Sequence, residues 1–257
     1  MKAKKRIKII TEWISNYANK HDIKTLVVGV SGGIDSAVVS TLCARTGVPT
    51  LAVSMPIRQS EHTHDLSLKH CAWLLRNFDF TDHYNVDLTS VFDQFEKATE
   101  LYNDELAYAN SRSRLRMMTL YQIAQSRSGI VVGTGNRVED FGVGFFTKYG
   151  DGGVDISPIA DCLKTEVWDM GRELGVLSEI IEAEPTDGLW ADGRTDRDQI
   201  GMDYADLERM MDLDTWSKKK IRQSVSESDQ AKLQQYRALR RRNLHKMQPI
   251  PVCRFDK

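Results

Sequence analysis

Residues 25–36 read Thr25-Leu-Val-Val-Gly-Val-Ser-Gly-Gly-Ile-Asp-Ser36, an apolar run rich in β-branched residues that leads into a turn of small residues. Such a run, flanked by turn formers, is typical of a strand buried on both faces of a parallel sheet. A helix is expected over 36–46, Gly47 ends it, and Thr50-Leu-Ala-Val-Ser54 predicts a second buried strand. These three segments form a βαβ unit.

The same alternation of strands and helices continues along the chain, which predicts an open, mostly parallel sheet in a three-layer α/β/α fold with helices on both faces. The further elements expected are a helix over 61–77, a weaker strand over 84–88, helices over 89–107 and 109–127, a strand over 130–133 and a helix over 164–175.

Two segments have the composition of loops. Residues 137–153 are rich in glycine and aromatic residues, which indicates an ordered loop close to a ligand. Residues 184–201 contain Pro185, Gly188, Gly193 and several aspartates, which predicts a mobile loop. Residues 202–245 return to a helical pattern, so the chain is expected to end in helices.

Composition narrows the functional class. The 257 residues include 35 Lys and Arg and 36 Asp and Glu, giving a net charge of −1, and 41% are hydrophobic. This balance argues against intrinsic disorder and against a dedicated nucleic-acid binder. The basic start runs into an amphipathic helix without a signal-peptide pattern, and no apolar run reaches the roughly 20 residues of a membrane span. We therefore expect a cytoplasmic protein with no membrane partner.

The stretch Gly29-Val-Ser-Gly-Gly-Ile-Asp-Ser36 is suited to hold phosphate. Small residues let the backbone approach an anion, and the free N–H groups at a helix start supply the binding field. The stretch is not a Walker A loop, since no Gly-Lys-Ser/Thr follows, and no acidic residue near Met55 completes a Rossmann pattern. The alternative is a glycine-rich turn in which Asp35 only caps the helix or lies on the surface.

A second motif follows the strand at 130–133: Gly133-Thr-Gly-Asn-Arg-Val-Glu139, then Gly144-Phe-Phe-Thr-Lys-Tyr-Gly-Asp-Gly-Gly-Val-Asp-Ile156 and Leu163-Lys164. The end of that strand would bring Thr134 and Glu139 near the first loop. Asp35 and Glu139 are then placed to share a Mg²⁺, which takes one or two carboxylates besides phosphate oxygens. From spacing alone, Glu139 is equally well a solvated surface acid.

Ser-Gly-Gly-x-Asp-Ser resembles the pyrophosphate loop of the N-type ATP pyrophosphatases, and residues 133–164 resemble the NAD synthetase family. Arg112-Ser-Arg-Leu-Arg-Met117, Pro185-Thr186 and His245-Lys246 extend the resemblance over nearly the whole chain. The chain departs from the family pattern at 187–189 and 197–201, so the acidic contacts of that loop differ. The resemblance implies a Rossmann-like fold of the adenine nucleotide alpha hydrolase type.

The resemblance also implies the roles of individual residues. Mg²⁺ would be held by Asp35 and Glu139, and the catalytic residues would be Asp35, Lys164 and Asp151, with Asp151 handling ammonia. ATP would be bound by Gly29, Val30, Ser31, Gly32, Gly33, Ile34, Asp35, Ser36, Thr134, Lys164 and Thr186. Deamido-NAD would be bound by Arg114, Lys148, Asp155, His245 and Lys246. Asp151 and Asp155 lie among glycines, so turn formation alone would also explain them.

The activity implied is ATP-dependent amidation of deamido-NAD with ammonia, by a homodimer whose interface includes residues 89–127. Residues 1–257 are expected to form a single synthetase domain without a glutaminase domain. The alternatives are another adenylating enzyme, such as an amidotransferase subunit or a tRNA-modifying enzyme, and a nucleotide sensor without catalysis. The histidines of Glu61-His-Thr-His-Asp65, with His70, suggest a metal cluster, but we expect ordinary polar positions because His62 and His64 point to different sides of a helix.

Overall fold

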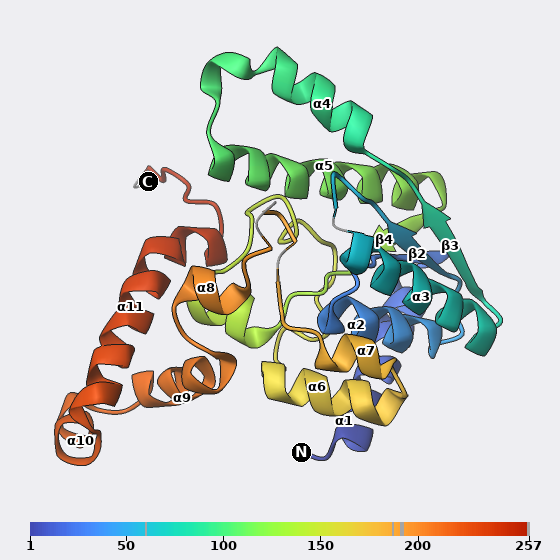
Figure 1. Ribbon diagram of the computed structural model, residues 1–257. Helices are drawn as coiled ribbons and strands as arrows, with labels where there is room; N and C mark the ends of the chain where they lie inside the picture. Colours follow the sequence, from blue (N-terminus) through green and yellow to red (C-terminus); the bar gives the residue numbers. More distant parts are fainter. Residues whose placement is uncertain (60, 187, 191–192, 256–257) are drawn as a thin grey trace.

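The computed structural model describes residues 1–59, 61–186, 188–190 and 193–255, which contain a parallel four-stranded sheet, on the right in Figure 1. Its strands are β1 (Thr25–Gly29), β2 (Thr50–Ser54), β3 (Thr81–Asn85) and β4 (Gly129–Val131). They lie in the order β3-β2-β1-β4, and all three pairings are parallel. The carboxyl ends of β1 and β4 are therefore neighbours at one edge of the sheet.

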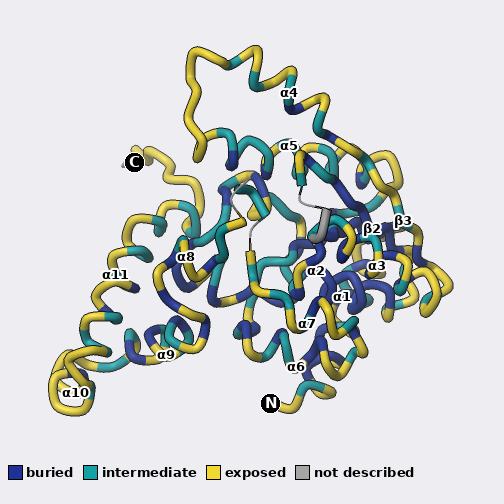
Figure 2. Tube along the Cα trace, viewed as in Figure 1, coloured by how far each residue is buried: buried dark blue, intermediate teal, exposed yellow. Residues whose placement is uncertain are grey.

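Helices cover both faces of the sheet because side chains alternate along each strand. In β1, Leu26 and Val28 pack with α1 (Ala3–Lys20), α2 (Ile34–Ala44) and α6 (Lys164–Leu174), whereas Val27 packs on the opposite face with α4 (Thr89–Ala98) and α5 (Glu105–Ser126). Helix α3 (Glu61–Asn77) contacts β2 and β3, and α7 (Ser178–Glu182) contacts α6 and α2. Figure 2 shows that burial is nearly continuous along α2, β1 and β2, whereas the edge strand β3 is mostly exposed.

The C-terminal helices form a second apolar cluster beside the sheet (Figure 1). It is built around a π-helical turn, η2 (Arg137–Val143), on which Leu207, Met210 and Leu233 pack. The elements of this cluster are α8 (Asp196–Ile200), α9 (Tyr204–Asp214), α10 (Lys218–Ser224) and α11 (Glu227–Met247). The predicted three-layer α/β/α fold with C-terminal helices is confirmed.

Three predicted elements have bounds that are wrong by more than two residues. The third strand lies at 81–85 rather than 84–88. Its position is fixed by parallel pairing with β2, in which Thr81 lies opposite Thr50. The helix predicted over 89–107 ends at Ala98, and a short 3-10 turn, η1 (Glu100–Tyr102), follows it. Asp104 then starts a new helix, since its side chain accepts a hydrogen bond from Ala107 N at 2.7 Å.

The segment expected as a loop over 137–153 also contains regular structure. Its first half is η2, which is capped by Asn136, whose side chain accepts hydrogen bonds from the N–H groups of Val138 and Glu139. Among the described residues, no helix is both long enough and apolar enough to cross a membrane.

Candidate active site

The loop between β1 and α2 is held in shape by its own hydroxyls. Ser36 Oγ accepts a hydrogen bond from Ser31 N at 3.2 Å and donates to Gly33 O at 3.0 Å, while Ser31 Oγ accepts from Gly33 N at 3.2 Å. Gly32 has φ +94°, and a Cβ there would lie 2.6 Å from the carbonyl oxygen of Thr63. Helix α2 starts without a side-chain cap, so its first N–H groups remain available to an anion.

A lysine from α6 lies between two carboxylates at the carboxyl ends of β1 and β4. Lys164 Nζ is 2.5 Å from Asp35 Oδ2, in the first turn of α2, and 2.7 Å from Glu139 Oε1, in η2. Lys164 is 2% exposed. Three residues that are 25 to 129 positions apart in sequence thus form one buried charge cluster.

Asn136 joins the two carboxylates of this cluster. Its Nδ2 donates to Asp35 Oδ1 at 3.0 Å, and its Oδ1 accepts from the N–H groups of Val138 and Glu139 at 3.0 and 3.1 Å. Asn136 is fully buried, so these bonds are shielded from water. The sequence prediction missed it, although an Asn three residues before Glu139 fits a helix-capping position.

The charges of the cluster shift one another's titration. Burial lowers the pKa of Lys164, but Asp35 and Glu139 outweigh burial and the pKa lies above its ordinary value. Burial raises the pKa of Asp35. Burial also opposes ionisation of Glu139, yet the charge of Lys164 and the hydrogen bonds from Lys164 and Tyr204 bring its pKa below the ordinary value. The lysine is therefore a permanent cation in this site.

The residues present fit a magnesium ion that is completed by phosphate. The carboxylates of Asp35 and Glu139 lie on either side of the cationic Nζ of Lys164. Carboxylate oxygens are also the ligands that Mg²⁺ prefers. Within the described ranges, no group of three or more His, Cys, Asp or Glu side chains is arranged to hold a metal. A metal bound by two carboxylates needs its other oxygens from a ligand and water, as MgATP would provide.

Four of the five residues predicted for deamido-NAD lie together where α5, the loop after η2 and the end of α11 meet. Arg114 Nε donates to Lys148 O at 3.3 Å, and Lys148 Nζ donates to His245 O at 3.0 Å. Lys246 Nζ donates to Phe146 O at 2.7 Å. The fifth residue, Asp155, lies beside β4 and accepts hydrogen bonds from Val131 N and Tyr121 Oη.

Asp151 is fixed at the start of its glycine-rich turn. Its Oδ1 accepts hydrogen bonds from Ser113 Oγ at 2.7 Å and from Thr147 N at 3.0 Å. Asp140, which the sequence prediction missed, lies in η2 next to Glu139. Burial and the charges of Asp151, Glu139 and Asp35 raise the pKa of Asp140 well above its ordinary value, and Lys246 opposes the shift.

Thr134 and Thr186 occupy different surroundings. Thr134 is half-buried, directly after β4. Thr186 Oγ1 donates to Arg194 O at 3.0 Å and accepts from Gly188 N, so it closes the 185–195 segment on itself. That segment rests on Gln59, whose Nε2 donates to Gly188 O at 3.2 Å.

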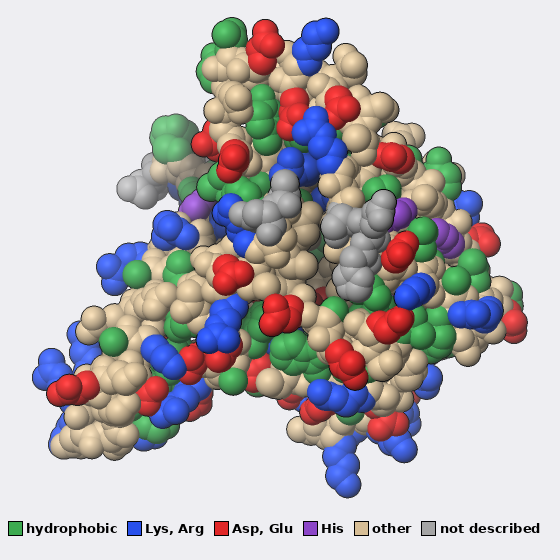
Figure 3. All heavy atoms as spheres, viewed as in Figure 1, with side chains coloured by type: hydrophobic (Ala, Val, Ile, Leu, Met, Phe, Trp, Pro, Cys, Tyr) green, Lys and Arg blue, Asp and Glu red, His purple; other side chains and the backbone are tan. Residues whose placement is uncertain are grey.

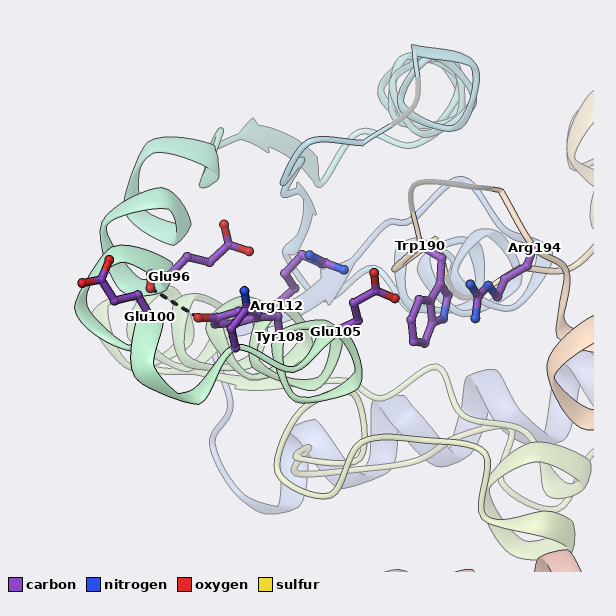
Figure 4. Close-up of a pocket in the computed structure, with 8 residues that line it drawn as sticks. Glu96, Glu100, Glu105, Tyr108, Arg112, Trp190 and Arg194 are labelled. Carbon is purple, nitrogen blue, oxygen red and sulfur yellow. Dashed lines mark hydrogen bonds between the residues drawn. The ribbon is translucent and has the colours of Figure 1, made fainter.

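A cavity of about 490 Å³ lies between the α4–α5 hairpin and the 185–195 segment (Figure 4). Arg194 stacks on Trp190, with its guanidinium carbon 4.1 Å from the centroid of the ring. No residue predicted for ATP, deamido-NAD or Mg²⁺ lines this cavity. Its lining residues are Glu96, Glu100, Asn103, Glu105, Tyr108, Arg112, Trp190 and Arg194.

The histidines near α3 have separate environments. His70 is fully buried, and its Nε2 lies 3.0 Å from Ser40 Oγ, whereas His64 is partly exposed. The side chains of Glu61 and His62 lie outside the described residues. On the face shown in Figure 3, acidic and basic side chains are intermixed.

Comparison with known proteins identifies the family that shares these features. The model of the family described as NAD synthase matches residues 6–250. The NH(3)-dependent NAD(+) synthetase of Alkaliphilus oremlandii is 38% identical over 215 residues, covering 81% of this chain and 85% of that protein.

Two solved structures have the same fold. NMN synthetase from Francisella tularensis superimposes with a TM-score of 0.87 and 30% identity, covering 99% of this chain and all of that one. The NH3-dependent NAD synthetase of Campylobacter jejuni gives a TM-score of 0.80 over 99% of this chain and 100% of that chain, and its 22% identity supports the fold alone. The family match spans both the Ser31–Ser36 loop and the Asp35–Glu139–Lys164 cluster, and the chain belongs to the NAD synthase family of ligases.

Proposed function

We propose that the protein catalyses the ATP-dependent amidation of deamido-NAD with ammonia, giving NAD, AMP and pyrophosphate through an adenylated intermediate. The observation that carries the proposal is the buried Lys164 between Asp35 and Glu139, next to a loop built for phosphate. Names of the relatives support ammonia as the nitrogen donor.

The reaction has two steps that balance. A carboxylate oxygen of the nicotinate attacks the α-phosphorus of ATP, the bond from that phosphorus to the bridging oxygen breaks, and pyrophosphate leaves. Ammonia then attacks the acyl carbon, and the single bond between this carbon and the AMP oxygen breaks. AMP leaves with the electron pair of that bond, and the nitrogen gives up a proton. Neither step requires oxidation or reduction.

The chain's own residues would stabilise the charge that forms on the leaving pyrophosphate. The N–H groups at the start of α2 bind phosphate oxygens, and Lys164 supplies a fixed positive charge a few ångströms away. Such preorganised electrostatics is usually the largest catalytic contribution. Mg²⁺, held by Asp35 and Glu139, would neutralise further negative charge on the triphosphate when it is bound.

The dinucleotide would lie against the cationic group at the end of α11. Arg114, Lys148 and Lys246 are already close to one another there, and they offer positive charge to its phosphates. Asp151, whose carboxylate accepts hydrogen bonds from Ser113 and Thr147, would bind ammonium and receive the proton that the nitrogen loses. The predicted loop over 184–201, of which residues 187, 191 and 192 lie outside the described residues, would cover the acyl-adenylate and exclude water.

A second copy of the chain would pack on the α4–α5 hairpin. This hairpin projects from the rest of the molecule, and much of it is exposed (Figures 1 and 2). Several of its exposed side chains are apolar. A solvated surface rarely collects such side chains without a partner. The exposed residues are Val91, Phe95, Leu101, Tyr102, Leu106 and Met118.

One assay tests the proposed function. Pyrophosphate release from ATP is measured with deamido-NAD and ammonium together and with each omitted. With deamido-NAD and ammonium both present, we expect rapid, continuous release of pyrophosphate together with formation of NAD. With deamido-NAD alone, we expect a burst of pyrophosphate release that stops after a single turnover. Release that does not depend on deamido-NAD would refute the proposal, and binding without any release would indicate a nucleotide sensor.

The similarity to an NMN synthetase favours nicotinate mononucleotide as a second candidate acceptor. The chemistry of the nicotinate carboxylate is the same, and only the adenylyl half of the acceptor is absent. The same assay with nicotinate mononucleotide decides between the two: a higher kcat/KM for the mononucleotide would reassign the substrate while leaving the reaction class unchanged.

A further inference from the structure

Tyr204 contacts the charge cluster although no sequence motif identified it. It is the first residue of α9 and is 9% exposed. Its hydroxyl oxygen lies 2.5 Å from Glu139 Oε1 and 2.6 Å from Asp196 Oδ2. The Glu139 oxygen is the same one that accepts from Lys164. Tyr204 therefore acts directly on a carboxylate that we assign to magnesium.

The ring of Tyr204 has an independent role in packing. Lys164 Nζ lies 4.7 Å from the ring centroid, and Trp168 packs against the ring edge to face at 5.8 Å. These contacts place the ring regardless of the hydroxyl. Removal of the hydroxyl alone should consequently leave the ring, and the cation that it faces, in position.

The other partner of the hydroxyl lies at the base of the 185–195 segment. Asp196 is 5% exposed, and its backbone N donates to Pro185 O at 3.0 Å. Thr186 Oγ1 donates to Arg194 O at 3.0 Å. These bonds bring the two ends of the segment together at Asp196, so the hydroxyl of Tyr204 joins the base of this segment to Glu139.

We propose that Tyr204 is a positioning residue that orients Glu139 for the metal and ties this orientation to the described ends of the 185–195 segment, where Asp196 N donates to Pro185 O. A partner that hydrogen-bonds a ligating carboxylate fixes its direction. The hydroxyl has one proton and donates to one carboxylate at a time, so Asp196 and Glu139 compete for it. The inference rests on the proposed function only in assigning Glu139 to a divalent cation.

Tyr204→Phe tests the inference, with Tyr236→Phe as the matched control. Tyr236 is also buried in the C-terminal cluster, but its hydroxyl lies 3.4 Å from Gly142 O, and no hydrogen bond among the described residues joins it to Glu139. Binding of Mn²⁺ in the presence of a non-cleavable ATP analogue is measured by electron paramagnetic resonance. We expect affinity to fall about 10- to 100-fold in Tyr204→Phe and to stay unchanged in Tyr236→Phe.

Trypsin cleavage after Arg194, in protein without ligands, provides the second measurement. Cleavage should be several-fold faster in Tyr204→Phe than in the control. Unchanged Mn²⁺ affinity would overturn the positioning role, and unchanged cleavage would overturn the link to the segment. If Tyr204→Phe does not fold, Asp196→Ala gives the test from the other side: faster cleavage with retained Mn²⁺ affinity is expected, and slower or equal cleavage would contradict the link.

The metal measurement needs neither deamido-NAD nor ammonia, so it can succeed even if the proposed acceptor is wrong. Conversely, a wild-type protein that binds no Mn²⁺ with the ATP analogue would refute this inference and the metal assignment, while leaving the choice of acceptor to the pyrophosphate assay.

Discussion

Lys164 is the residue whose environment most directly indicates function. A cation at the first position of a helix opposes the helix dipole, and burial adds a cost of desolvation. The nearby Asp35 and Glu139 offset both effects, yet a buried ion pair is seldom more stable than apolar packing of the same volume. The cluster is thus better explained by binding and catalysis than by stability.

Replacing Lys164 with Met keeps most of the side-chain volume and removes the charge. The two carboxylates would then repel each other without an internal cation, which should destabilise the fold by about 3 kcal/mol and abolish turnover. Added Mg²⁺ should raise the melting temperature of this variant more than that of the wild type. Equal Mg²⁺ effects on both proteins would contradict the placement of the metal between these carboxylates.

Asn136→Ala should loosen both carboxylates at once. It removes the cap of η2 and the bond to Asp35, which should cost about 1–2 kcal/mol of stability and weaken MgATP binding about tenfold. Asn243→Ala is the control, because Asn243 Nδ2 bonds Val143 O at the other end of η2. Denaturant unfolding and nucleotide titration of both variants provide the comparison. A similar loss of MgATP binding in the control would show that η2 stability alone is responsible.

The shape of the turn between β1 and α2 depends on the position of α3, which packs against Gly32. Gly32 and Gly47 both have positive φ, but only Gly32 faces backbone atoms that a Cβ would meet. Gly47→Ala should cost about 1 kcal/mol, from backbone strain alone. Gly32→Ala should cost at least twice that and abolish ATP binding. Thermal unfolding with calorimetric ATP titration measures both effects, and equal losses in the two variants would disprove the steric argument.

The packing of α3 against α2 creates a pH-dependent term in stability. Burial lowers the pKa of His70 to about 4, from the ordinary value of 6.5. Between these values the unfolded chain binds more protons, so stability rises with pH. The contribution is complete above about pH 6.5 and is lost as the pH falls toward 4.

His70→Gln should remove this term. Between pH 7 and pH 5 the wild type should lose about 2 kcal/mol more than the variant in free energy of unfolding, measured with urea. His21→Gln, at an exposed position of the chain, should behave like the wild type. If His70→Gln loses as much stability as the wild type over this range, His70 is not the group responsible.

At the scale of the whole molecule, the exposed hairpin predicts a dimer. Leu101 and Leu106 are 90% and 59% exposed, and charges there would be buried in the proposed interface. Leu101→Glu with Leu106→Glu should convert the protein to a monomer and reduce turnover with deamido-NAD. Leu75→Glu, on α3, should leave the dimer intact. Light scattering at micromolar concentration measures the mass, and a monomeric wild type would refute the interface.

Sequence patterns predicted most of the architecture because the strands carry strong local signals. The runs at 25–29 and 50–54 are continuous and apolar, and the helix over 61–77 was predicted with the bounds that it has. The edge strand was misplaced because its residues are mostly polar, and its position comes from pairing with β2. The break between α4 and α5 was predicted about residue 108 but lies at 99–104, because Asp104 was not interpreted as a helix cap.

Long local motifs were enough to identify the family and the strand-to-helix loop from the sequence, and the resemblance to the family predicted Asp35 and Glu139 as acidic residues of one site. Only the folded structure shows that Lys164 lies between these carboxylates, and that Asn136 hydrogen-bonds Asp35 while Tyr204 hydrogen-bonds Glu139. The physical reason is that these side chains come from the starts of separate elements, and only the packing of α2, η2, α6 and α9 against one another brings them within hydrogen-bonding distance.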